Sequence, residues 1–88
     1  MAGNTRGKLK ENFEGMHRNF DWCLHHVNHS LALIATQLAF TDAMLAVKGD
    51  KDKEEQVLMD NPLYKGIRAL GEGVKQIDEL AQGIYAHI

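Results

Sequence analysis

The sequence is short of cysteine. Cys23 is the only cysteine among 88 residues, so no disulfide can form within the chain. We therefore expect a reducing, cytoplasmic setting. Residues 1–8 are polar and basic, and they lack the apolar run of a secretory signal. This absence agrees with a protein that is not exported.

The sequence also lacks a long apolar run and a strong charge of one sign. Residues 31–47 are mostly apolar, but Thr36, Thr41 and Asp42 interrupt them, and the stretch is shorter than the roughly 20 residues that cross a bilayer. The net charge is −2, from 10 basic and 12 acidic residues. A nucleic-acid-binding protein normally has a basic excess. We therefore expect no membrane partner, and nucleic acid is the last of the partners considered.

Catalytic and phosphate-binding patterns are absent as well. Ser30 is the only serine, and nothing marks a general base and an orienting carboxylate beside it. The segment Gly71-Glu72-Gly73 lacks the preceding strand and the third glycine of a dinucleotide-binding fingerprint. The chain is expected not to be an enzyme and to carry no cofactor other than a divalent metal.

What the sequence does have is helical periodicity over residues 12–48. Apolar residues recur in steps of three and four, and a seven-residue leucine repeat runs among them. The pattern predicts a long helix of coiled-coil type, ending at Lys48 and Gly49, where a cation and a left-handed glycine form a C-terminal signal. Residues 1–11 are expected to be a flexible basic N-terminus. The apolar positions are Phe13, Met16, Phe20, Leu24, Val27, Leu31, Ile34, Leu38 and Leu45.

A second helix is predicted over residues 62–87. Asn61 is a good N-cap, and Pro62 suits the first helical position. Residues 49–61 are charged and are expected to form the connecting loop. Glycines within the second helix leave an alternative open, in which it breaks at Leu70-Gly71-Glu72-Gly73 and the domain has three helices. The apolar stripe contains Leu63, Ile67, Leu70, Val74, Ile77, Ala81, Ile84 and Ile88.

These patterns predict a single all-α domain over residues 1–88, an antiparallel helical hairpin. Helices of roughly 55 and 39 Å are unequal, so the second should end beside residues 22–26, and Phe13, Met16 and Phe20 should project past it. Surplus apolar surface predicts assembly with further copies into a four-helix bundle or a higher oligomer. The expected oligomer interface contains Phe13, Met16, Phe20, Leu24, Val27, Leu31, Ile34, Leu38, Leu45, Ile67, Leu70, Val74, Ile77 and Ile84.

Histidines are concentrated in one segment, because four of the five lie between residues 17 and 29. His25 and His29 are one helical turn apart, which is a spacing that places two imidazoles on one metal ion. His87, near the end of the second helix, is the expected third ligand. The alternative interpretation is that these histidines are solvated side chains on the outer side of an amphipathic helix.

Trp22 lies off the leucine repeat and has two interpretations. It can stack on the base or ring of a nucleotide-like ligand while cationic neighbours meet phosphate. Alternatively, it packs on a neighbouring chain or on Tyr85. The predicted ligand-binding residues are Arg18, Trp22, His25, His26, His29 and Tyr85.

Three functions follow from these observations. The first is a small non-enzymatic oligomer that acts by protein–protein interaction, as an adaptor, an inhibitor or an assembly factor. The second is an oligomeric bundle that binds or sequesters a nucleotide-like molecule or a divalent metal at the Trp22 cluster. The third is a nucleic-acid-binding four-helix bundle. Surplus apolar surface favours the first.

Overall fold

The computed structural model describes residues 2–87, with side chains for residues 6–87. Within that range the chain is helical and contains no strand, which confirms the all-α class. The elements are α1 (Ala2–Leu38), α2 (Asp42–Leu45), α3 (Lys51–Asp60) and α4 (Pro62–Tyr85). The long first helix and α4 account for most of the molecule.

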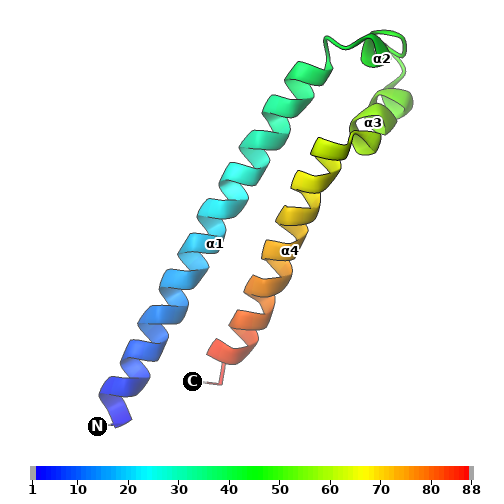
Figure 1. The fold of residues 1–88 in the computed structure, drawn as a ribbon. Helices are drawn as coiled ribbons and strands as arrows, with labels where there is room; N and C mark the ends of the chain where they lie inside the picture. The colour runs from blue at the N-terminus through cyan, green and yellow to red at the C-terminus, as the bar shows by residue number, and fades with distance from the viewer. Residues whose placement is uncertain (1, 88) are drawn as a thin grey trace.

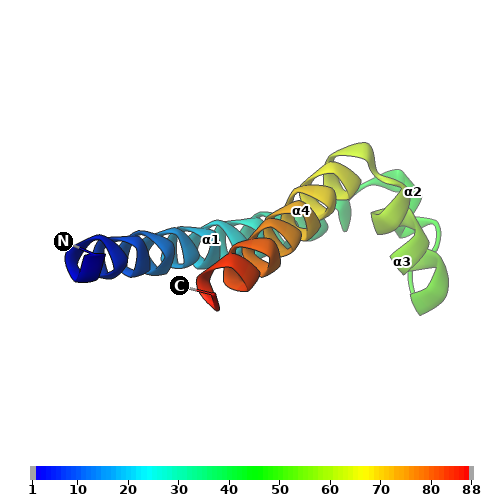
Figure 2. The same cartoon turned by 90° about the horizontal axis from the view of Figure 1, so that it is seen from below.

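The molecule is a rod with extents of 66 × 18 × 17 Å. Helices α1 and α4 lie side by side and run in opposite directions, so that both chain ends lie at the same end of the rod (Figure 1). Helices α2 and α3 lie at the other end. Viewed from below, α3 turns across the direction of α1 and α4 (Figure 2).

Helix α1 ends at Leu38, earlier than the predicted end at residue 48. Thr41 is the physical reason, because its Oγ1 donates to the carbonyl of Leu38 at 2.7 Å and accepts from the amide of Met44 at 3.4 Å. A threonine that bonds to both sides closes one helix and caps the next. Gly49 does adopt the left-handed conformation, with φ of 96°, but it ends the turn after α2. At its other end α1 begins at Ala2, so residues 2–11, expected to be a flexible tail, are helical.

The charged connection predicted over residues 49–61 contains the helix α3. Asp50 caps this helix by accepting from the amide of Lys53 at 3.3 Å, and Glu54 Oε1 accepts from the amide of Gly49 at 3.1 Å. The Asp50 carboxylate satisfies an amide that a helix start leaves without an intrahelical partner, and the Glu54 carboxylate ties the helix back to the preceding turn. Helix α3 also contacts α4.

Helix α4 begins where the sequence predicts. Asn61 Oδ1 accepts from the amides of Leu63 and Tyr64, at 3.0 and 3.1 Å, and Pro62 is the first helical residue. The helix continues through Gly71 and Gly73 to Tyr85, so the alternative of a broken helix is wrong. The end of the predicted stripe, Ile88, lies outside the described residues.

Burial within this rod is shallow. Among the described side chains, Val27, Met44 and Val74 are the buried apolar ones. Gly71 is buried too, and a Cβ built on it would lie 3.0 Å from Cγ1 of Val27. The absence of a side chain at Gly71 therefore allows α1 and α4 to approach closely at the middle of the rod.

The alignment of α4 along α1 differs from the predicted one. Tyr85 packs against Phe13, with ring centroids 6.3 Å apart, and does not lie beside residues 22–26. Because α1 ends early, α4 begins beside its end and reaches further along it. Phe13, Met16 and Phe20 are therefore partly covered, and the prediction that they project past the second helix is wrong. The part of α1 that extends past α4 is its start (Figure 1).

Candidate functional site

Trp22 stands on the outer side of α1, roughly opposite Phe20 and Val27 on the helix. Its side chain is among the exposed large apolar groups, at 63%. The indole stacks on His26, with centroids 5.9 Å apart and an interplanar angle of 26°, and meets His25 edge-on at 5.9 Å and 90°. The structure therefore brings three of the predicted ligand-binding residues together.

An open depression of about 390 Å³ lies beside Trp22 and is lined by Arg18, Asp21, Trp22 and His25. It offers a cation, a carboxylate and an aromatic ring on one surface. This combination can hold a flat molecule that carries both a hydrogen-bond donor and an anionic group. His29 does not line the depression, although it is exposed on the same helix.

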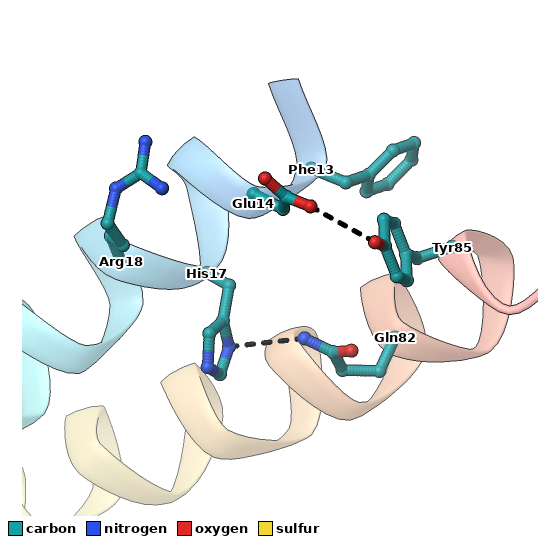
Figure 3. Close-up of a pocket in the computed structure, with 6 residues that line it drawn as sticks. All are labelled: Phe13, Glu14, His17, Arg18, Gln82 and Tyr85. Carbon is teal, nitrogen blue, oxygen red and sulfur yellow. Dashed lines mark hydrogen bonds between the residues drawn. The ribbon is translucent and has the colours of Figure 1, made fainter. Parts of the chain in front are cut away.

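Tyr85 is part of a different depression, of about 330 Å³, between the two helices (Figure 3). Its hydroxyl donates to Glu14 Oε1 at 3.2 Å. This hydrogen bond raises the pKa of Tyr85 above 10.0, because ionisation would remove the donated hydrogen; partial burial and the negative charge of Glu14 raise the pKa further. The expectation that Tyr85 lies beside Trp22 is wrong, because the alignment places it against Phe13. The lining residues are Phe13, Glu14, His17, Arg18, Gln82 and Tyr85.

His17 joins α1 to α4 at this depression. Its Nδ1 lies 2.9 and 3.0 Å from the carboxylate oxygens of Asp78, and its Nε2 lies 3.4 Å from Oδ2 of Asp21. The hydrogen bond to Asp78 raises the pKa of His17 above 6.5; partial burial lowers it, and the charges of Asp21 and Asp78 raise it further. The protonated ring thus has two acceptors, one on each helix.

Gln82 offers His17 a second arrangement. Its Nε2 lies 3.1 Å from the same Nδ1 that faces Asp78 (Figure 3). An Nδ1 that carries a hydrogen donates to Asp78, whereas one without a hydrogen accepts from Gln82. The sequence pattern did not single out Glu14, Asp78 or Gln82 as members of this site. Nothing in the local pattern marks them, because their pairing depends on how α4 aligns with α1.

The predicted metal ligands are not brought together within one chain. His25 and His29 are one turn apart on α1, but His87 follows Tyr85 and therefore lies roughly 15 Å or more along the rod from His25. In the part of the chain that the structure describes, no group of three or more His, Cys, Asp or Glu side chains is placed to hold a metal ion. A metal shared between chains stays a prediction.

The residues of the predicted oligomer interface are divided by the structure. The predicted interface positions of α1, from Phe13 to Leu38, are buried or half-buried, and α1 packs against α4. Leu45 of α2 is exposed. On α4, Ile67 and Val74 are covered, while Leu70, Ile77 and Ile84 are exposed. The sequence grouped these five in one stripe, and the structure separates them into two.

On α4, two neighbouring rows of side chains each recur at intervals of three or four residues. We call the row that contacts α1 the covered row, and the row one residue before it the uncovered row. The large apolar side chains of the uncovered row are between 52% and 71% exposed. The covered row contains Tyr64, Ile67, Gly71, Val74, Asp78, Ala81 and Tyr85. The uncovered row contains Leu63, Gly66, Leu70, Gly73, Ile77, Leu80 and Ile84.

Comparison with protein-family models, with curated proteins and with solved structures gave no match. None of the described helices is both long and apolar enough to cross a membrane. The features of this chain that bear on its function are the Trp22 depression, the His17 contact and the uncovered row.

Proposed function

We propose that this chain is a small non-enzymatic helical protein that acts by binding protein chains, including copies of itself. In this proposal the pair of α1 and α4 is a helical hairpin that forms one half of a larger bundle. An adaptor, an inhibitor or an assembly factor would each work in this way.

The uncovered row carries this proposal. Its five large apolar side chains lie along one line of a single helix and are more than half exposed. Scattered exposed leucines are ordinary on a protein surface, whereas a continuous apolar row is typical of an association site. The shallow burial between α1 and α4 supports the same proposal, because a chain of this size needs more apolar burial than one helix pair supplies.

Light scattering and native mass spectrometry on the purified protein test the proposal together. We expect a mass of two or more chains, and we expect a partner protein to be retained from native extract in defined stoichiometry. A single-chain mass at every concentration, with no protein retained, would count decisively against a binding function.

A second candidate function is supported by the depression beside Trp22. There the chain would bind a nucleotide-like molecule, with the ring against the indole and the phosphate near Arg18, or a divalent metal at the neighbouring histidines. Arg18 and Asp21 flank an aromatic side chain that is open to solvent, which favours a flat, charged ligand.

Trp22 is the only tryptophan, so its fluorescence reports on this depression directly. Titration with nucleoside phosphates and with divalent ions should quench or shift the emission. Arg18→Ala should weaken a phosphate ligand at least about tenfold, and Lys10→Ala, elsewhere on α1, should not. Emission that stays unchanged across both panels would remove this candidate.

A further inference from the structure

Two glycines of the uncovered row have no packing reason within one chain. A Cβ built on Gly66 or Gly73 meets no atom within 4 Å, whereas one on Gly71 meets Val27 at 3.0 Å. Glycine weakens a helix relative to alanine. At Gly71 the close approach of α1 explains why a glycine is present despite this cost to the helix. At Gly66 and Gly73 no atom fills the place that a side chain would take, and the two positions form notches beside Leu70.

The chain exposes enough surface for a partner to cover. Its accessible area is 6713 Å², whereas a folded monomer of 9.9 kDa typically exposes about 5,200 Å². The excess of about 1,500 Å² is larger than the roughly 800 Å² that each partner contributes to a stable interface. One face of the rod can therefore be covered by a second chain of similar size.

The spacing within the uncovered row is complementary to itself. When two copies of α4 are laid antiparallel, Leu70 of each copy meets Gly73 of the other, and Ile77 of each meets Gly66 of the other. Antiparallel helices pack in such layers, with the side chains of one entering the gaps of the other. A two-fold interface requires one surface to fit itself in this way.

Charged residues do not oppose this pairing. The charges of central α4, from Arg68, Glu72 and Lys75, line a groove with Val27 and Asn28 on the opposite side of the helix. The uncovered row itself contains only leucine, isoleucine and glycine. No charge would be buried without a partner when two such rows meet.

We propose that the uncovered row is where a second copy of this chain docks, with α4 antiparallel to α4 and the large side chains of one copy entering the glycine notches of the other. The two pairs of α1 and α4 then form a four-helix bundle. This inference rests on the proposed function and identifies a second copy of the chain as one of the proteins that it binds.

Glycine-to-alanine variants test the notches, because alanine acts in opposite directions on the helix and on the interface. Gly73→Ala should strengthen α4 and raise the melting temperature in dilute solution, but weaken dimerisation about tenfold or more. Gly83→Ala is the matched control, since Gly83 is on neither row and its Cβ also meets nothing within 4 Å. It should raise the melting temperature and leave dimerisation unchanged. Equal dimerisation by the two variants would overturn the inference.

Thiol cross-linking tests the orientation. In a Cys23→Ser background, Leu63→Cys and Ile84→Cys chains are mixed with a short bismaleimide. Antiparallel rows place residue 63 of one chain within about 6 Å, along the helix axis, of residue 84 of the other, so only the mixture should yield cross-linked dimers. Leu63→Cys that cross-links by itself would mean parallel helices and would overturn the inference.

The outcomes also separate this inference from the proposed function. A dimer that survives Leu70→Glu with Ile77→Glu, and that gives no cross-link from α4, would overturn the docking site but leave a protein-binding function standing. A monomer at every concentration would overturn the docking site. If that monomer also retains no partner from extract, the proposed function fails with it.

Discussion

The covered and uncovered rows of α4 differ in composition, and hydrophobicity alone would predict the opposite choice of which row is buried. The covered row contains a carboxylate and two tyrosines, while the uncovered row contains three leucines, two isoleucines and two glycines. The more apolar row is the one left exposed. Helix α4 therefore faces α1 with the side that fits its surface, and the side with the most apolar area stays available to another chain.

Three contacts explain why the covered row fits. Gly71 allows Val27 to approach. Asp78 receives the hydrogen bond of His17, and Tyr85 packs on Phe13. Turning α4 by one residue to bury the leucines would break all three contacts and would place Leu70 where Gly71 now meets Val27. Steric fit at one glycine and polar pairing near one end of α4 together select the covered row.

The largest expected effect is at Gly71. Gly71→Leu places a side chain where a Cβ would already lie 3.0 Å from Val27. The variant should destabilise the fold by about 2 to 3 kcal/mol, because the two helices must separate or rotate. Urea denaturation followed by circular dichroism measures this loss. Gly83→Leu, with open space around it, should change the free energy of unfolding far less. Equal effects from the two would mean that close approach at Gly71 does not select the covered row.

Shortening one side chain in each row compares the rows directly. Val74→Ala removes methyl groups from a buried position and should cost about 2 kcal/mol of stability. Leu70→Ala, in the exposed row, should stay within about 0.5 kcal/mol in dilute solution, where chains do not associate. Thermal and urea unfolding at low concentration check both values. A larger loss at Leu70 would show that the uncovered row is buried in the single chain.

The N-cap of α4 stabilises the whole helix and therefore does not favour either row. Asn61→Ala removes the side chain that accepts from the amides of Leu63 and Tyr64, and it should cost about 1 kcal/mol. The loss should appear in the unfolding free energy without changing which row faces α1. Asn19→Ala, on the surface of α1, is the control and should not destabilise the fold.

The smallest expected effect is the pH dependence of the contact at His17. Its pKa is raised above 6.5 in the folded chain, mainly by the hydrogen bond to Asp78. The stabilisation is therefore fully present below pH 6.5 and is lost as the pH rises through the folded pKa. The ring is 42% exposed, so solvent screens the pair and the effect is modest. The difference in unfolding free energy between the native chain and His17→Gln should shrink as the pH rises. Parallel pH profiles would contradict this role for His17.

Several parts of the structure are readable from individual residues. The Asn61-Pro62 start of α4 rests on local capping chemistry, and the inward side of α1 rests on a helical period sustained from Phe13 to Leu38. The sequence predicts the end of α1 too late, because Lys48 and Gly49 form a strong terminal signal. Thr41 interrupts the helix first, by bonding to the backbone on both sides of it.

In the candidate sites, contacts within one helix could be predicted from the sequence, whereas contacts between helices could not. Trp22, His25 and His26 lie on one helix, so their proximity follows from helical spacing. His17 with Asp78, and Phe13 with Tyr85, depend on how far α4 extends along α1. That distance depends on where α1 ends and how long the connection is. The sequence pattern predicts a shorter connection, because it places the end of α1 at residue 48.

The sequence by itself determined that this chain is helical, that α4 starts at Pro62 and that it has more apolar surface than one helix pair can bury. Only the tertiary structure decided which row of α4 faces α1. The two rows have the same period and are one residue apart, so periodicity cannot distinguish them. The choice rests on the fit of Gly71 to Val27 and on the pairing of Asp78 with His17, which exist only when both helices are in place.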